Sequence, residues 1–296
     1  LLEYKPHIIQ GWMYHANLVA QIAGKMANVP VLWNIRQSLP SLSEEKALTS
    51  FMIRLGALFS SFPSRIVYNS LCSALQHENL GYKKEKRVLI SNGFDTQTFV
   101  PSALARESLR RELSLPADAF LIGLIARYHP VKDHRTFFSA AESFGKKNLN
   151  VHFLLAGKGI DARNPEILSF LKKMTIQRQI HLLGERQDIP NITASLDIAT
   201  CCSKAEAMPN TIGEAMSCAV PCVVTDVGDL AALIGQTGIV VEKQNSQALE
   251  KAWESIYFLP EKERKKSGES ARERIVLRYS LSHCIAQYSS LYNNKL

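Results

Sequence analysis

The sequence predicts an α/β protein made of two doubly wound parallel sheets. Short apolar runs alternate with segments of helical spacing along almost the whole chain. This alternation is typical of βαβ units, in which helices cover both faces of a parallel sheet. It is interrupted once, over residues 92–118, where Pro101 and Pro116 stand among polar residues, and it then restarts. We therefore expect a domain boundary in this stretch and a second sheet after it.

The first part of the chain is predicted to form a short doubly wound domain. Its expected strands, which are apolar runs bounded by polar residues, are residues 7–10, 31–35, 65–70 and 87–93. Its expected helices, with apolar residues every three or four positions, are residues 15–29, 51–62 and 73–81. Gly81 is expected to close the last of these helices, since glycine tolerates the left-handed conformation that ends many helices.

The second part repeats the same alternation over a longer stretch. Its expected strands are residues 120–126, 151–157, 180–184, 196–202, 221–226 and 238–242. Its expected helices are residues 133–145, 165–178 and 210–219, one that Asn245 or Ser246 caps and that ends near Phe258, one after Pro260, and a last one from Ser280 to about Tyr292. We expect domains over residues 1–100 and 101–279, and a C-terminal helix over 280–296 that packs back toward the first domain.

The composition excludes several classes of protein. The formal net charge is +8 with a pI near 9.2, which favours anionic partners such as nucleotide phosphates or acidic lipid surfaces, or else a solvated basic face. The six cysteines form no CxxC pair, so reduced thiols are expected rather than disulfides or a zinc site. No apolar run approaches the ~20 residues of a membrane-spanning helix, and the start lacks the pattern of a signal peptide. We expect a soluble or peripheral protein.

Basic side chains and glycines follow two of the predicted strands. In doubly wound sheets, ligands bind outside the carboxyl ends of the strands, and with two sheets the cleft between them is the default site. Arg127 and Lys132 follow the strand at 120–126 and are placed to bind one diphosphate, although two basic loop residues are often only solvated. Gly157 follows the next strand and permits a tight turn that a ligand can approach.

Two carboxylates flank the predicted helix that begins near Asn210. The unpaired amide groups in the first turn of a helix form an anion site. Glu214 lies close to this first turn, so simple complementarity to the helix dipole explains it. Glu206 lies outside the helix, and that explanation does not apply to it. A carboxylate there is suited to accept hydrogen bonds from the hydroxyl groups of a polyol.

The stretch from Glu206 to Glu214 reads EAMPNTIGE, and this E-x7-E motif resembles the donor site of the family 4 retaining glycosyltransferases. That family has the GT-B fold, two Rossmann-like domains facing a cleft. Other pieces that resemble the family in the same order are residues 67–70, 90–101, 122–133, 152–159, 181–198 and 215–229.

The resemblance implies a role for each candidate residue. Arg127 and Lys132 would bind the diphosphate of a nucleotide-sugar and stabilise the leaving group. Glu206 would contact sugar hydroxyls, and Glu214 the ribose hydroxyls. The remaining implied substrate contacts are Asn210, Thr211 and Ile212 through their backbone amides, Gly157 under the nucleotide, and Arg186 or Asp188 near the base. No metal ligand and no cofactor is expected, and the donor is expected to be UDP-linked.

The first domain departs from the family pattern. Where many members carry a histidine after the second strand, this chain has Arg36, which would serve the leaving phosphate or an anionic acceptor. His15 follows the first strand and is a further candidate for the site. Nothing in residues 1–15 matches the glycine-rich loop with which members begin. We therefore expect a truncated first domain, on the acceptor side, that lacks roughly the first quarter of the family's length.

The predicted function is that of a metal-independent hexosyltransferase of this family. Its acceptor would be a lipid-linked or cell-surface polysaccharide or lipopolysaccharide, and its location the cytoplasm or the inner face of the membrane. The segment 51–62 fits an anionic membrane surface or a core helix. The alternative is an inactive fragment that binds nucleotide-sugars. No nucleic-acid module and no GxGxxG dinucleotide fingerprint is present. The sugar, base, acceptor, linkage and oligomeric state stay open.

Overall fold

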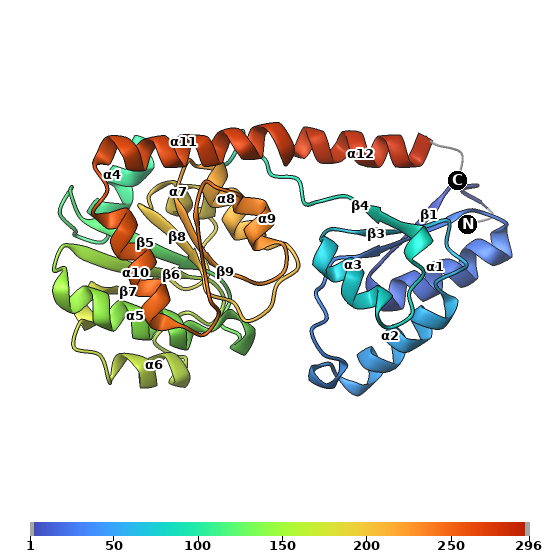
Figure 1. The fold of residues 1–296 in the computed structure, drawn as a ribbon, viewed down its shortest axis with the longest axis horizontal. Coiled ribbons are helices and arrows are strands. Elements are labelled where there is room, and N and C mark those ends of the chain that lie inside the picture. The colour runs from blue at the N-terminus through green and yellow to red at the C-terminus, as the bar shows by residue number, and fades with distance from the viewer. Residues whose placement is uncertain (1–2, 294–296) are drawn as a thin grey trace. The chain divides into compact units, whose positions relative to one another are not determined.

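The computed structural model describes residues 3–293, and their contacts divide the chain into two compact units (Figure 1). Unit 1 contains the residues up to Gly93, the short segment Glu206–Met208 and the residues from Ser282 on. Unit 2 contains Phe94–Ala205 and Pro209–Leu281. The contacts therefore divide after Gly93 rather than at residue 100. Of the expected C-terminal helix 280–296, residues 294–296 lie outside the described residues.

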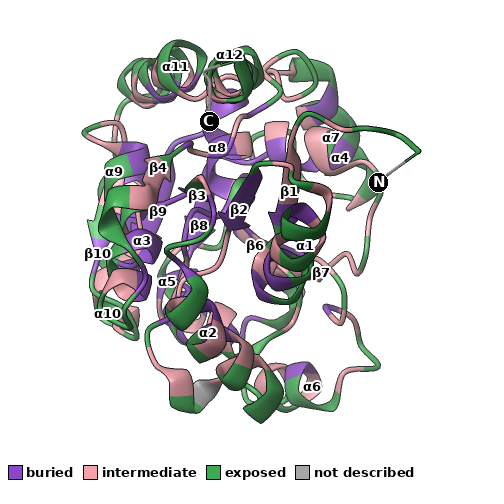
Figure 2. Ribbon diagram, turned by 90° about the vertical axis from the view of Figure 1, so that its right-hand side faces the viewer, coloured by how far each residue is buried: buried purple, intermediate pink, exposed green. Residues whose placement is uncertain are grey.

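Unit 1 is built on a parallel sheet whose strand order follows the sequence. The strands, in the order β1-β2-β3-β4, are Ile9–Trp12, Val31–Ile35, Arg65–Tyr68 and Arg87–Leu89. The crossover helices are α1 (Met13–Ala27), α2 (Ala47–Phe59) and α3 (Leu71–Glu78), with short 3-10 turns at Leu42–Glu44 and Lys84–Lys86. Strand β2 is buried along its whole length, which explains why four of its five residues are apolar. In Figure 2 the inner strands β2 and β3 are coloured mainly as buried and the outer turns of α1 and α2 as exposed.

The last helix, α12 (Leu281–Asn293), contacts the strand ends of unit 1. The Tyr288 hydroxyl accepts a hydrogen bond from Asn34 Nδ2 at 2.7 Å, and its ring stacks on Trp12 with a centroid distance of 6.4 Å. Asn34 follows Trp33 on β2 and Trp12 ends β1. The aromatic residues of α12 thus pack against the carboxyl ends of β1 and β2.

Unit 2 contains a larger parallel sheet with a doubly wound topology. Its strands, in the order β10-β9-β8-β5-β6-β7, are Ile239–Val241, Cys222–Thr225, Ile198–Cys201, Phe120–Ile125, Val151–Ala156 and Ile180–Leu182. The chain begins in the middle at β5, continues through β6 and β7, and then returns to the other side of β5 with β8. The direction of winding therefore reverses between β5 and β8.

Helices cover both faces of the sheet of unit 2. They are α4 (Ala103–Glu112), α5 (His134–Lys147), α6 (Pro165–Leu171), α7 (Ile189–Ala194), α8 (Asn210–Ser217), α9 (Leu230–Ile234), α10 (Ser246–Tyr257) and α11 (Glu261–Arg278). Helices α5 and α10 pack together, and Trp253 of α10 contacts Phe137 and Phe144 of α5 and Phe153 of β6. Helix α4 packs on α7, and α11 on α8.

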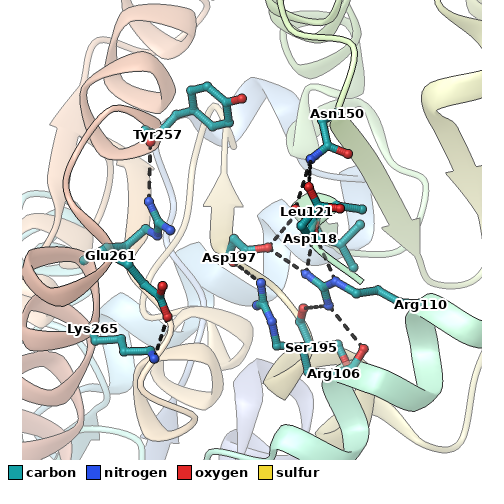
Figure 3. A network of polar contacts seen from close by, with 12 residues as sticks. Arg106, Arg110, Asp118, Leu121, Asn150, Ser195, Asp197, Tyr257, Glu261 and Lys265 are labelled. Atoms are coloured by element: carbon teal, nitrogen blue, oxygen red, sulfur yellow. Dashed lines mark hydrogen bonds and ion pairs between the residues drawn. The ribbon is translucent and has the colours of Figure 1, made fainter. Parts of the chain in front are cut away.

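A buried polar network joins α4 to the amino ends of β5 and β8 (Figure 3). The Asp197 carboxylate accepts from Arg110 at 2.8 Å, from Arg106 at 2.7 Å and from the Leu121 amide at 2.8 Å. The Arg110 guanidinium also donates to the carbonyl oxygens of Ala119 and Ser195. Every part of this ion pair therefore has a partner, as a buried charge requires.

The alternation of strands and helices agrees with the sequence, and the differences are local. The first strand is Ile9–Trp12 instead of residues 7–10, and α6 ends at Leu171, well before residue 178. Helices α7 and α9 were not predicted because six and five residues are too few to show a helical period. Asn245 caps α10 by accepting from the Ala248 amide at 2.9 Å. All six cysteines have free thiols.

Candidate functional site

The predicted site residues of unit 2 concentrate where the sheet changes its direction of winding. Arg127 follows β5, and the loop that leads to α8 follows β8, the neighbour of β5 in the sheet. Parallel strands end at the same edge of a sheet, so both loops leave from the carboxyl edge. In open α/β sheets, the crevice outside this edge at the point of reversal is the usual ligand site.

The loop after β5 presents Arg127 to solvent and is itself firmly held. Arg127 is exposed, and among the residues 3–293 it has no ion-pair partner. The 3-10 turn Pro130–Lys132 is fixed to the loop after β8, because the Lys204 amide donates to the Val131 carbonyl at 2.8 Å. The Cys202 thiol donates to the Lys132 carbonyl at 3.3 Å. The backbone that carries both cations is thus tied to β8.

Gly157 is required by a close approach of two backbones. Its φ is +145°, and a Cβ atom there would lie 2.3 Å from the Ala126 carbonyl oxygen and 2.9 Å from the Arg127 nitrogen. Its own amide donates to the Gly184 carbonyl at 2.7 Å. The resemblance assigns Gly157 a place under the nucleotide. The structure gives this glycine a further role, because it sets the backbone position of Arg127.

Helix α8 begins without a side-chain cap. Its N-cap residue is Pro209, which offers no side-chain hydrogen bond to the first turn. Asn210 is exposed, Thr211 is half-buried and Ile212 is buried. Ile212 faces the core and Gly213 lies against the ring of Phe94, so the helix is anchored from its third residue on. The backbone amides of a helix start that lacks a capping side chain suit an anionic group.

Glu214 lies on α8 one turn after Asn210. Its side chain is half-buried, and burial raises the pKa of its carboxyl group above the ordinary value. The ionised form of a half-buried carboxyl group is stabilised when hydroxyl or amide groups donate hydrogen bonds to it. Glu206 is also half-buried, but the short segment around it groups with unit 1.

Arg186 differs from the other predicted residues because its donors are used within the chain. Its guanidinium pairs with Asp188 at 2.7 and 2.8 Å and with Glu112 at 2.5 and 3.2 Å. The two carboxylates raise its pKa further above the ordinary value. This pairing joins the loop after β7 to α4, and the contact of Arg186 or Asp188 with the base stays a prediction.

The predicted residues of unit 1 have different surroundings. His15 is an exposed residue of the first turn of α1. Arg36 is half-buried just after β2, where its guanidinium lies 5.5 Å from the centroid of the Trp12 ring. It donates to the Tyr288 hydroxyl at 3.4 Å and to the side-chain oxygen of Asn92. Arg36 is therefore held by three side chains of unit 1.

The structure thus separates the candidates into two sets. The residues of unit 2 at the carboxyl edge of its sheet are Arg127, Lys132, Gly157, Asn210, Thr211, Ile212 and Glu214. His15, Arg36 and Glu206 belong to unit 1. The sequence prediction missed Asn92 and His134. Asn92 follows a strand in the stretch ISNG, a position that could have identified it.

His134 lies buried at the start of α5, directly after the loop that carries Lys132. Its ring is 5.0 Å from the ring of Tyr128, and neither ring nitrogen has a hydrogen-bond partner among the described residues. Burial lowers its pKa to about 4, with a smaller contribution from the charge of Lys132. The side chain is therefore neutral at pH 7.

No metal centre is formed within the described part of the chain. In residues 3–293, no three side chains of histidine, cysteine, aspartate or glutamate lie together as a metal-binding group. Nor does this part contain a helix that is long and apolar enough to cross a membrane.

Comparison with known proteins finds similarity to glycosyltransferases. Residues 119–257 match the family model "Glycosyl transferases group 1". The chain is 24% identical over 234 residues to UDP-Gal:alpha-D-GlcNAc-diphosphoundecaprenol alpha-1,3-galactosyltransferase from Escherichia coli, which covers 77% of this chain. It is 25% identical over 297 residues to N,N'-diacetylbacillosaminyl-diphospho-undecaprenol alpha-1,3-N-acetylgalactosaminyltransferase from Campylobacter jejuni, covering 96% of this chain and 76% of that protein.

Among solved structures, HepE from Anabaena in complex with UDP and glucose has a TM-score of 0.88 at 22% sequence identity. The similarity covers 99% of this chain and 80% of that one. This likeness confirms the predicted GT-B fold with its two parallel α/β sheets. The chain spans 59% of the length of the Escherichia coli protein, and 37% and 49% of two further curated relatives. The matched model and these relatives support the prediction of a transferase enzyme.

Proposed function

We propose that the protein is a retaining glycosyltransferase that moves a hexose from a UDP-linked donor to a lipid-linked or cell-surface glycan acceptor, without a metal ion. One observation carries the proposal: Arg127, Lys132 and the uncapped start of α8 all follow β5 and β8, the strands between which the winding of unit 2 reverses. Two cations and a set of backbone amides near this point of reversal support a diphosphate site, because doubly wound sheets bind such ligands there.

The chemistry follows from the charge that develops during transfer. Breaking the bond between the sugar and the diphosphate leaves negative charge on the phosphate oxygens and positive charge on the sugar ring. Arg127, Lys132 and the amides of Asn210–Ile212 are assigned to the phosphate charge, which preorganised donors stabilise without rearrangement. Glu214 is assigned to the ribose hydroxyls and Glu206 to the hydroxyls of the sugar.

Two residues of unit 1, His15 and Arg36, are assigned a role on the acceptor side. His15 is exposed and Arg36 is half-buried, and a cation at Arg36 suits an anionic acceptor or the leaving phosphate. The named relatives support the substrate classes. The Escherichia coli relative is described by its UDP-Gal donor and its diphosphoundecaprenol-linked acceptor, and the HepE structure contains UDP and glucose.

Helix α2 supports a peripheral position on an anionic membrane. It buries Ile53 and Gly56 within unit 1, as a core helix would. Its outer side exposes a run of apolar side chains, namely Leu48, Phe51, Leu58 and Phe59, followed by Phe62. Lys83 and Lys84 are exposed beside the end of the helix, where the Lys83 amide donates to Ser60 Oγ at 3.1 Å. An apolar helix face flanked by cations is suited to anionic lipid. The proposed location is the inner face of the cytoplasmic membrane.

Binding to lipid vesicles tests this location. The full chain should co-sediment with phosphatidylcholine vesicles that contain phosphatidylglycerol and not with phosphatidylcholine alone. The double variant Phe51→Ser/Leu58→Ser should stay in the supernatant. Equal binding of that variant and the parent protein would contradict the assignment to α2.

The function itself is tested by turnover. A thermal-shift panel of nucleoside diphosphates and nucleotide-sugars should show stabilisation by UDP and a UDP-hexose, because a ligand that binds only the folded state raises the melting temperature. The same UDP-hexose should then release UDP when a diphosphoundecaprenol-linked sugar is added, in the presence of EDTA, with retention of the anomeric configuration by NMR. Binding without turnover would favour the alternative, an inactive nucleotide-sugar-binding fragment.

A further inference from the structure

Asn92 lies buried at a junction of three segments of unit 1. It follows β4, and its side chain is near the ends of β2 and β3, with the residue 8% exposed. Its Oδ1 accepts from Asn69 Nδ2 at 3.1 Å and from the Arg36 guanidinium. Its Nδ2 donates to the Met208 carbonyl at 2.9 Å. One amide group therefore connects two strand ends to the segment Glu206–Met208.

An asparagine side chain meets both requirements at this position. The end that faces Arg36 and Asn69 must accept hydrogen bonds, and the end that faces the Met208 carbonyl must donate one. A carboxylate has acceptors at both ends, so aspartate would keep the contact with Arg36 and lose the donor to Met208. A buried carbonyl without its donor is costly, so this exchange would release the segment.

The acceptor side of Asn92 is rigidly supported. Arg36 packs on Trp12 and donates a hydrogen bond to the Tyr288 hydroxyl. The same hydroxyl accepts a second hydrogen bond from Asn34 Nδ2 at 2.7 Å. Met208 makes a second contact with Asn92. The backbone amide of Asn92 donates to the Met208 sulfur at 3.4 Å. A fixed cluster at the strand ends is thus joined to a loop residue that follows Glu206 by two positions.

We propose that Asn92 is a positioning residue for the transfer reaction. It fixes the segment Glu206–Met208 to the strand ends of unit 1 and so sets the position of the Glu206 carboxylate. This inference rests on the proposed function, in which Glu206 contacts the hydroxyls of the donor sugar. Asn92 itself does not touch substrate in this account. Its effect reaches the reaction only through the backbone of Met208.

Kinetics of Asn92→Asp test the inference, with Asn92→Leu as a second variant of similar size that also lacks the donor. We expect kcat to fall by about 10-fold to 100-fold while KM for the UDP-hexose changes by less than about threefold. Combined with Glu206→Gln, Asn92→Asp should add little, because residues that act through one group are not additive. A kcat within twofold of the parent protein, or full additivity with Glu206→Gln, would overturn the proposal.

A matched control separates this effect from the general loss of a hydrogen bond. Asn148 in unit 2 also donates its Nδ2 to a carbonyl, that of Phe144 at 3.0 Å, and lies on no predicted site. Asn148→Asp should therefore leave kcat unchanged. A loss of kcat in Asn148→Asp as large as that in Asn92→Asp would count against a specific role.

Hydrogen exchange keeps the inference testable even if the protein transfers no sugar. In Asn92→Asp, the amides of Ala207 and Met208 should exchange faster than in the parent protein, while the peptides of β5 and β8 are unchanged. Unaltered exchange at Ala207 and Met208 would refute the positioning role. Faster exchange in a protein that neither binds nor turns over UDP-hexoses would support the role of Asn92 and contradict the proposed function instead.

Discussion

The two edges of the sheet in unit 2 use arginine in opposite ways. At the amino edge, Arg110 is 2% exposed and donates to Asp197 and to three backbone carbonyls. At the carboxyl edge, Arg127 is exposed and has no ion-pair partner among the described residues. The donors of Arg110 are therefore used within the protein, whereas those of Arg127 are available to form hydrogen bonds with a ligand.

This difference separates charges that are paired within the fold from charges that are available to a ligand. Arg186 shows that a basic residue in a loop after a strand is not sufficient, because Glu112 and Asp188 already occupy its guanidinium. A cation is a candidate for binding when the backbone beneath it is fixed and its side chain has no internal carboxylate. Arg127 meets both conditions, since Gly157 and the contacts of its loop hold its backbone.

The largest expected effect is on stability, at the amino edge. Arg110→Ala should lower the free energy of unfolding by about 3–5 kcal/mol, because it leaves the buried Asp197 carboxylate without its main partner. Chemical denaturation measures this loss. Arg163→Ala is the control and should leave stability unchanged, because Arg163 is exposed and within residues 3–293 its one ion pair is with Asp161. A small effect of Arg110→Ala would remove the contrast between the two edges.

The next effect is on activity, at the carboxyl edge. Arg127→Ala and Lys132→Ala should each lower kcat by about 10²-fold to 10³-fold, the cost of removing one preorganised donor from a developing negative charge. Arg127→Ala should melt at the temperature of the parent protein. Steady-state transfer assays and calorimetry check both statements. Turnover near that of the parent protein in either variant would discredit the assignment of these cations.

The dependence of stability on pH tests the buried side chain of His134, which follows the loop that carries Lys132. The pKa of His134 is about 4 in the folded protein against an ordinary 6.5, so the unfolded chain binds a proton at a higher pH. The free energy of unfolding should therefore fall as the pH is lowered from about 6.5 to 4, by on the order of 3 kcal/mol from this residue at most.

The variant His134→Asn should show a shallower loss over this pH range, whereas replacing the exposed His15 by asparagine should not alter the slope. Denaturant midpoints at pH 7, 6, 5 and 4 provide the measurement. Parallel curves for His134→Asn and the parent protein would show that His134 does not resist protonation.

The smallest effect concerns the glycine that positions Arg127. Gly157→Ala should cost about 1–3 kcal/mol of stability through backbone strain, and it should lower kcat by displacing Arg127. Gly184→Ala is the matched control. Gly184 also has a positive φ, of +64°, but a Cβ there would meet its nearest neighbours only at 4.0 Å. If both variants reduce kcat equally, the close approach at Gly157 has no special role.

The sequence was sufficient for the fold and for placing Arg127, Lys132 and the start of α8 after strands of the second sheet. The apolar runs identified all the strands, since buried parallel strands are apolar on both faces. Strand ends also identified Arg127, Lys132 and the start of α8. Helices α7 and α9 were missed because they have only six and five residues.

Long-range pairing could not be read from the chain. The sequence around Arg186 does not indicate its ion pair with Glu112, which lies 74 residues away. Nor does the sequence around Arg36 indicate Tyr288, 252 residues away. These partners decide whether a basic residue is available to a ligand. Neither the strand end that indicated Arg127 nor the resemblance that indicated Arg186 carries information about such pairing. The structure distinguishes them because it shows which guanidinium is already paired.

Calorimetric titration with UDP measures whether the carboxyl edge of unit 2 binds a diphosphate through Arg127. We expect UDP to bind the parent protein and the control Arg163→Gln with the same Kd. Arg127→Gln should weaken binding at least about tenfold, as the loss of a charge-assisted hydrogen bond implies. Equal affinity of all three proteins, or no binding of UDP to the parent protein, would contradict this expectation.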